Sequence, residues 1–187
     1  MSSVGDRAVP DGDASEERAP PTTDPTLAVR GLTKRYGETV ALEDVDIAVG
    51  DGEFVAVVGP SGCGKSTLLR VLSGLEERFE GEAAVGGTDV RRGGSDDVGM
   101  VFQEPRLLAW ADVRANVAIG LPASVDRDDP GARDRIDDLI ETVGLDGFAE
   151  SRPDELSGGM AQRVSLARGL AYDPEVLLLD EPFSALD

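Results

Sequence analysis

Eight consecutive residues have the types and spacing of a phosphate-binding loop: Gly59, Pro60, Ser61, Gly62, Cys63, Gly64, Lys65 and Ser66. They fit the pattern G-x-x-x-x-G-K-[ST], the P-loop, in which glycines let successive backbone N–H groups point inward at phosphate oxygens. Lys65 can reach the β- and γ-phosphates, and the Ser66 hydroxyl can ligate Mg²⁺. A glycine-rich turn without a ligand is the alternative. An apolar run before the loop and a helical pattern after it favour a nucleoside triphosphate site.

Two carboxylates, Asp180 and Glu181, follow the apolar run Val176–Leu179 near the end of the chain. Asp180 can hold Mg²⁺ directly or through water, because hard cations prefer oxygen ligands. Glu181 can orient and deprotonate an attacking water molecule. A solvated turn is the alternative, but a short apolar strand that runs into two carboxylates and a proline favours a catalytic pair.

A serine and two glycines, Ser157-Gly158-Gly159, open a predicted helix. The backbone N–H groups at such a helix start form a second possible anion site. Taken alone, the motif fits an ordinary helix cap equally well.

In order along the chain, these motifs resemble those of the ATP-binding cassette family of transport ATPases, over about residues 27–187. Tyr36 resembles the family's adenine-stacking aromatic residue, Gln103 its Q-loop glutamine, and the segment 184–187 its D-loop. The resemblance implies that the ligands are ATP and Mg²⁺. It implies catalytic roles for Lys65, Gln103 and Glu181, and metal contacts from Ser66, Gln103 and Asp180. The implied nucleotide contacts are Tyr36, the eight P-loop residues, Thr67, Ser157, Gly158 and Gly159.

The family resemblance also implies partners. Two cassettes pair head to tail around two ATP molecules, so that the P-loop of one faces Ser157-Gly158-Gly159 of the other. An integral membrane permease is driven by this cycle, a solute-binding protein takes part indirectly, and the cassette sits on the cytoplasmic face of the cell membrane. The alternatives are a non-transport ATPase of the same family, acting in DNA repair or translation, and an ATP-binding fragment without turnover.

The segment 101–110 and Met160 resemble the nitrate, sulfonate and taurine importer ATPases. In those proteins this region meets the membrane subunit. Trp110 and the pair Leu107-Leu108 are therefore either apolar anchors for that subunit or part of the protein core, and both interpretations stay open.

The chain departs from the family pattern at its C-terminal end. It contains no histidine, although the family has a switch histidine on a strand after the D-loop. It ends at the D-loop, so we expect a C-terminally truncated fragment, with a naturally short protein as the alternative. Missing strands and helices would leave sheet edges and apolar helix faces exposed.

The predicted fold class is α/β: a P-loop NTPase core with a mostly parallel sheet, an N-terminal antiparallel β sub-domain and an inserted helical sub-domain. We expect residues 1–25 to be a disordered acidic tail. Residues 26–187 form the ATP-binding domain, with the helical sub-domain at about 104–152. We expect strands at 27–32, 39–42, 45–49, 54–58, 98–102 and 176–179, and short strands joined by Gly86-Gly87 within 82–90. We expect a loop at 93–95 and helices at 67–73, 112–121, 133–143 and 160–172.

The composition is strongly acidic, with 37 Asp and Glu against 18 Lys and Arg, and a formal net charge of −19. Such a surface repels nucleic acid and anionic lipid, so a nucleic-acid partner is not expected. Lys34 and Lys65 are the only lysines. This scarcity favours a halophilic protein, in which molar salt screens the self-repulsion, over an ordinary acidic one. No apolar run approaches the roughly 20 residues of a membrane span. The single cysteine, Cys63, excludes an internal disulfide.

Overall fold

The computed structural model describes residues 25–92 and 97–182. Residues 1–24 of the expected acidic tail, the 93–95 loop and the 184–187 motif lie outside these residues. The elements in chain order are β1 (Leu27–Tyr36), β2 (Thr39–Val49), α1 (Lys65–Leu72), β3 (Glu80–Val85), β4 (Thr88–Asp89), the 3₁₀ turn η1 (Val90–Arg92), β5 (Val98–Val101), α2 (Val113–Ala118), α3 (Pro130–Thr142), the 3₁₀ turn η2 (Pro153–Glu155), α4 (Gly158–Ala171) and β6 (Val176–Leu179).

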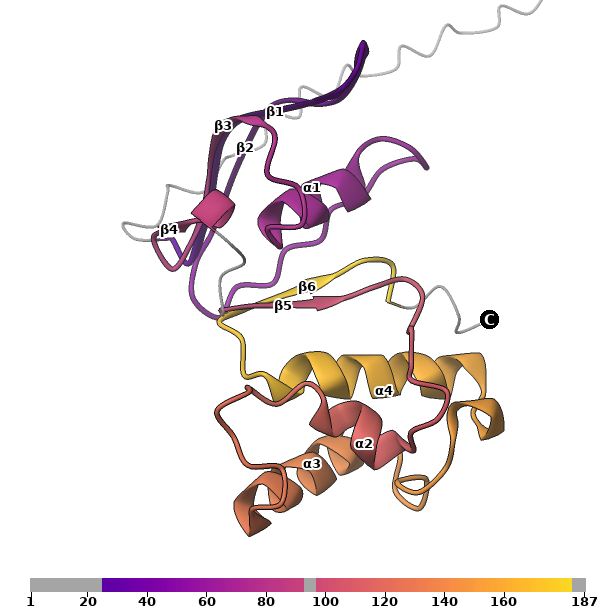
Figure 1. Cartoon of the computed structure of the whole chain (residues 1–187). Helices are drawn as coiled ribbons and strands as arrows, with labels where there is room; N and C mark the ends of the chain where they lie inside the picture. The colour runs from indigo at the N-terminus through magenta and orange to yellow at the C-terminus, as the bar shows by residue number, and fades with distance from the viewer. Residues whose placement is uncertain (1–24, 93–96, 183–187) are drawn as a thin grey trace, which may run out of the picture.

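The N-terminal strands form an antiparallel sheet in the order β2-β1-β3-β4 (Figure 1). The hairpin of β1 and β2 pairs Leu27 with Val49 at one end and Tyr36 with Thr39 at the other. The two strands predicted at 39–42 and 45–49 are one strand, because the pairing passes through irregular register shifts without breaking. This sheet confirms the antiparallel part of the predicted fold class.

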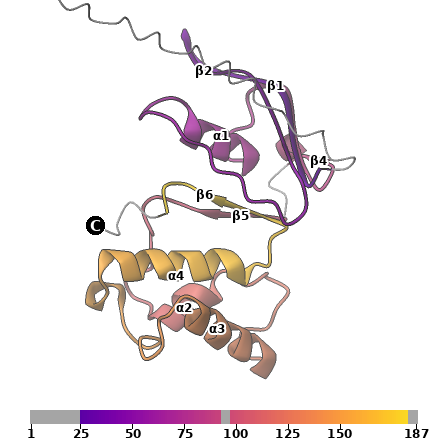
Figure 2. The ribbon, with the colours of Figure 1, turned by 180° about the vertical axis from the view of Figure 1, so that it is seen from behind.

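Helix α1 packs against the antiparallel sheet and lies between it and the β5–β6 pair (Figures 1 and 2). A first hydrophobic cluster joins these layers through residues that each of them buries. Its members include Leu27, Val29 and Leu32 of β1, Val71 of α1, Val85 of β3 and Leu178 of β6. This cluster fixes where α1 begins relative to the end of β6.

Strands β5 and β6 pair in parallel, with Val98 opposite Val176 and Val101 opposite Leu179. The prediction of a strand at 54–58 is wrong for the described residues. That segment has no ladder partner among them, and Phe54 and Val58 are 83% and 91% exposed. An apolar run becomes a strand only where a neighbouring strand accepts its backbone hydrogen bonds.

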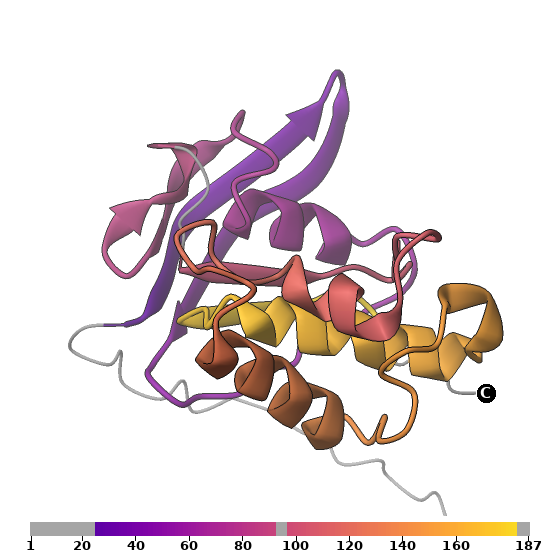
Figure 3. The same cartoon turned by 60° about the horizontal axis from the view of Figure 1, so that its bottom comes forward.

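Helices α2, α3 and α4 cover the other side of the β5–β6 pair, and α2 and α3 pack on α4 (Figures 1 and 3). A second hydrophobic cluster forms here, with Val113, Val117, Ile136, Ile140 and Val164 among its members. All three predicted helices are present, with α2 ending three residues earlier than expected and α3 beginning three residues earlier. No helix in the described ranges is long and apolar enough to cross a membrane.

The ends of these helices follow local sequence signals. The Asp112 carboxylate accepts a hydrogen bond from Ala115 N at 2.8 Å and caps α2. Helix α3 begins at Pro130, a favoured first helical residue. It ends before Gly144, which adopts a φ of 65°. Ser157 caps α4, so the Ser-Gly-Gly motif lies at a helix N-terminus, as the sequence predicts.

Candidate functional site

The P-loop joins the exposed segment 54–58 to α1, which begins at Lys65. Gly64 precedes the helix at a φ of 101°, a conformation that favours glycine. A side chain there would also collide with the Ala41 carbonyl oxygen of β2. Glycine is therefore required for the loop to pack on β2 while its N–H groups and the helix N-terminus face the same region.

Lys65 holds its positive charge within this loop. Its Nζ donates to the carbonyl oxygens of Gly59 and Pro60, at 2.9 and 3.2 Å. An ammonium placed here, beside the N-terminus of α1, gives the loop a cation that can attract a phosphate group.

Four polar residues from three separate parts of the sequence converge where β5 and β6 end. The ladder continues one residue beyond the strands, as Asp180 N donates to the Val101 carbonyl oxygen at 2.9 Å. Ser66 Oγ donates to Asp180 Oδ1 at 3.0 Å. Gln103 Nε2 donates to Glu181 Oε2 at 3.0 Å. Because parallel strands end at the same edge of a sheet, Gln103 and Glu181 meet there, next to the first turn of α1.

Glu181 is held in a strained backbone conformation. Its φ is 46°, in the left-handed region that non-glycine residues rarely occupy. Its carboxylate is exposed and accepts the Gln103 amide. Such strain persists where surrounding contacts impose it, and it gathers at functional sites. A carboxylate in this position can accept a proton from a bound water molecule.

The Ser66 hydroxyl and the Asp180 carboxylate fit a Mg²⁺ ion by their chemistry. Both offer an oxygen atom as a metal ligand, and the two oxygens lie 3.0 Å apart. Among the described residues, no group of three or more His, Cys, Asp or Glu side chains could hold a metal on its own. Mg²⁺ is commonly bound through one or two protein ligands together with waters and substrate phosphates.

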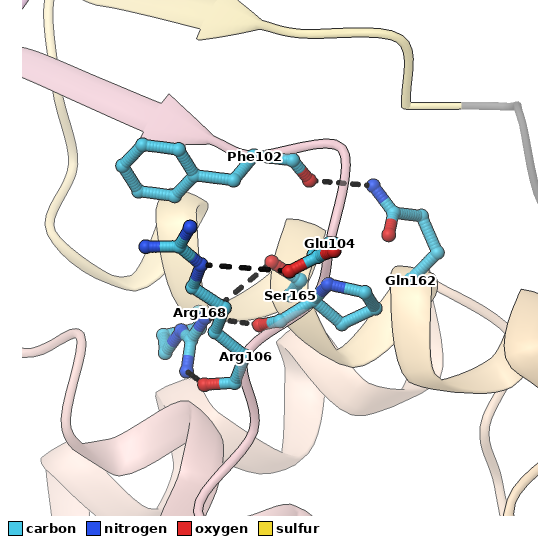
Figure 4. Close-up of polar contacts among 7 residues, drawn as sticks. Phe102, Glu104, Arg106, Gln162, Ser165 and Arg168 are labelled. Atoms are coloured by element: carbon cyan, nitrogen blue, oxygen red, sulfur yellow. Dashed lines mark hydrogen bonds and ion pairs between the residues drawn. The ribbon is translucent and has the colours of Figure 1, made fainter.

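Side chains of α4 fix the backbone on both sides of Gln103 (Figure 4). Gln162 Nε2 donates to the Phe102 carbonyl oxygen at 3.1 Å. Arg168 donates to the carbonyl oxygens of Pro105 and Arg106, at 2.7 and 3.2 Å. Partial burial lowers the pKa of the Arg168 guanidinium, and these carbonyl oxygens accept its hydrogen bonds in place of water. The helix that starts at the Ser-Gly-Gly motif is thus bonded directly to the segment that carries Gln103.

The Ser-Gly-Gly motif itself is not brought to the P-loop. Ser157 Oγ accepts a hydrogen bond from Met160 N at 3.3 Å, and Ser157 and Gly158 are exposed. In the described part of the chain, no hydrogen bond joins the motif to the P-loop. The helix α4 lies on the opposite side of the β5–β6 pair from α1 (Figures 1 and 2).

Tyr36 lies at the end of β1, at the hairpin turn, and is 45% exposed. Its hydroxyl donates to Glu76, and Glu76 forms an ion pair with Lys34. Sequence reasoning assigned no role to Lys34, Glu76, Gln162 or Arg168. Of these four residues, only Lys34 stands out in the sequence as a candidate, because the chain contains just two lysines and the other lies in the P-loop.

Trp110 is 75% exposed, so it is not part of the core, whereas Leu107 packs against the second hydrophobic cluster. The two interpretations of this segment thus apply to different residues. Trp110 lines a surface hollow of about 600 Å³ together with Leu108, Ile119 and the charged side chains of Arg127, Glu150 and Arg152. An exposed tryptophan beside a hollow is typical of a protein–protein interface.

Residues 42–184 match the family profile described as "ABC transporter". The chain is 51% identical over 154 residues to the "Aliphatic sulfonates import ATP-binding protein SsuB 1" of Xanthomonas axonopodis pv. citri (strain 306), which covers 82% of this chain and 61% of that protein. It is 46% identical over 166 residues to SsuB of Bacillus licheniformis, covering 87% and 63%. The chain thus spans less than two thirds of the length of these relatives.

Solved structures give the same picture. The chain is similar to the dimeric ATP-binding cassette MJ0796 in a post-hydrolysis state bound to ADP and Pi. The TM-score is 0.75 at 32% sequence identity, and the match covers 86% of this chain and 76% of that one. This confirms the predicted α/β fold class, including its parallel core and its helical part.

Proposed function

The chain belongs to the ABC transporter family, and we propose that it is the ATP-binding and ATP-hydrolysing part of an importer for sulfonate, nitrate, taurine or a similar solute. The observation that carries this proposal is the convergence of Ser66, Gln103, Asp180 and Glu181 at the end of the parallel strands. The names of the relatives support the sulfonate class and do not favour a non-transport ATPase. Magnesium-dependent release of phosphate from ATP tests the proposal.

Each residue has a distinct part in the proposed reaction. The P-loop N–H groups and Lys65 bind the β- and γ-phosphates. Ser66 and Asp180 would hold Mg²⁺, which neutralises negative charge on the phosphates when bound. Glu181 accepts the proton of the attacking water, and Gln103, which donates to the Glu181 carboxylate, orients that carboxylate.

We further propose that the functional unit is a head-to-tail dimer. Ser157 and Gly158 lie exposed at the start of α4, and Gly159 follows them in its first turn. The N–H groups at this helix start would meet the γ-phosphate of ATP bound to a second cassette, so ATP would stabilise the paired state. The similarity to a dimeric cassette supports this arrangement.

The membrane partner is proposed to dock at the hollow beside Trp110. We also propose that residues 26–187 are an ATP-binding domain with a helical sub-domain inserted at about 104–152. The residues that line the hollow belong to this sub-domain. A permease bound here would keep the chain at the cytoplasmic face of the membrane, and a solute-binding protein would act only through that permease. Trp110 would be the apolar anchor, since tryptophan is enriched among residues that dominate interface energy.

Trp110→Ala is expected to weaken binding to the permease by about 30-fold, because a central interface tryptophan contributes on the order of 2 kcal/mol. The measurement is co-purification and the dissociation constant with the permease in detergent. Phe148→Ala is the matched control, since Phe148 is also exposed but does not line the hollow. Equal permease affinity of Trp110→Ala and the unchanged chain would contradict the docking site.

We also propose that the protein is adapted to high salt, as its net charge of −19 implies. Molar KCl is expected to raise the unfolding midpoint by about 2–4 °C for each kcal/mol of repulsion that it screens, the range for a domain of roughly 150–250 residues. Thermal unfolding followed by circular dichroism checks this result. Sucrose is the control, because it stabilises by exclusion from the surface without screening charge. A midpoint that does not respond to KCl would refute the adaptation.

A further inference from the structure

Lys34 is a buried cation in β1, two residues before Tyr36. It is 3% exposed, and its Nζ donates to the Arg78 carbonyl oxygen at 2.6 Å and pairs with Glu76 Oε1 at 2.7 Å. A buried charge is tolerated only where it is paired and hydrogen-bonded. Both requirements are met by the segment that follows α1.

The same two residues contact Tyr36. The ring centroid lies 4.6 Å from Lys34 Nζ, within the range of a cation–π contact. The Tyr36 hydroxyl donates to Glu76 Oε2 at 3.1 Å. The two oxygens of Glu76 are thus shared between Lys34 and Tyr36, and the tyrosine at the hairpin turn is held at its hydroxyl and at one face of its ring.

Glu76 also joins this cluster to the last turn of α1. Its backbone N donates to the Arg70 carbonyl oxygen of α1, the helix that begins at the P-loop. Hydrogen bonds from Lys34 and Tyr36 lower the pKa of Glu76, so its carboxylate stays ionised at neutral pH. Glu76 therefore ties β1 to α1, through its carboxylate on the strand side and its backbone N–H on the helix side.

We infer that Lys34 and Glu76 are positioning residues that hold the Tyr36 ring ready to stack on the adenine base. This inference rests on the proposed function, because it assumes that ATP binds at the P-loop. A tyrosine at a hairpin turn has rotamers to lose when a base stacks on it. Fixing the ring beforehand removes that entropic penalty from binding. The remaining exposed part of the ring is available to the base.

The test compares two ligands, ATP and inorganic tripolyphosphate, by calorimetry with Mg²⁺ in molar KCl. Tyr36→Phe removes the hydroxyl bond but keeps the ring. Lys34→Met/Glu76→Leu replaces the ion pair by apolar side chains of similar size, which avoids leaving one buried charge alone. Each variant is expected to bind ATP about 2- to 10-fold more weakly, the range for one side chain that must be ordered on binding. Affinity for tripolyphosphate, which has no base, is expected not to change.

A double-mutant cycle sharpens the test. Adding Tyr36→Phe to Lys34→Met/Glu76→Leu is expected to cause no further loss of ATP affinity, since the hydroxyl has already lost its partner. Glu38→Gln, on the same hairpin, is the control and is expected to change neither ligand's affinity.

Two results would overturn the inference while leaving the proposed function intact. In one, the variants keep the full preference for ATP over tripolyphosphate. In the other, both ligands weaken equally, which would indicate a purely structural role. If the unchanged chain bound neither ligand, the proposed function would fail first, and the inference with it.

Discussion

ATP turnover by Glu181→Gln is expected to fall by about 10²- to 10⁴-fold, the usual contribution of a general base. The amide cannot accept the proton of the attacking water. It does keep the size of the carboxylate and an oxygen that can accept the Gln103 hydrogen bond. ATP affinity should therefore stay close to that of the unchanged chain. Phosphate release at saturating ATP, measured beside equilibrium binding, separates the two quantities.

Glu104→Gln is the matched control for Glu181→Gln. Glu104 is an exposed carboxylate in the same region, next to Gln103, and it pairs with Arg106 at 4.0 Å. Its substitution is expected to leave turnover unchanged. Unchanged turnover in Glu181→Gln would instead mean that another group activates the water.

Lys65→Ala is expected to weaken ATP binding by about 10- to 100-fold, because hydrogen bonds to charged groups contribute roughly 1.5–3 kcal/mol. In the structure the ammonium is held within the P-loop by two carbonyl oxygens, where phosphates would meet it. Calorimetric titration with ATP and Mg²⁺ measures the change.

Arg70→Ala is the control for charge alone, since Arg70 lies in the last turn of the same helix, away from the P-loop. Its affinity for ATP is expected to match that of the unchanged chain. Equal loss in both variants would mean that general positive charge, not a lysine in the loop, accounts for binding. Undiminished affinity in Lys65→Ala would exclude Lys65 from phosphate recognition.

The sequence predicted the parts of the site that consist of neighbouring residues. A P-loop and a strand ending in Asp180-Glu181 are local patterns, because backbone conformation and a few side chains carry their chemistry. Their meeting depends on the parallel register of β5 and β6, which places Gln103 beside Glu181. Tertiary packing determines which residues of β5 and β6 lie opposite one another. From the sequence, the meeting of these motifs could be expected only through the family resemblance.

Pairings between distant segments were not predictable in the same way. The run at 54–58 has the composition of a buried strand, but strand formation depends on a partner that composition does not reveal. The exposure of Trp110 likewise depends on which helices cover it. The ion pair of Lys34 and Glu76 joins a strand to the segment beyond α1, and neither residue has a local pattern that names the other.

We propose that this chain contains an ATP-hydrolysing site assembled at the end of β5 and β6. Steady-state phosphate release from ATP in molar KCl, with and without Mg²⁺, tests it most directly. We expect release that requires Mg²⁺, saturates with ATP and disappears in Glu181→Gln. Bound ATP without Mg²⁺-dependent release of phosphate would contradict the claim of hydrolysis and would leave a nucleotide-binding site alone.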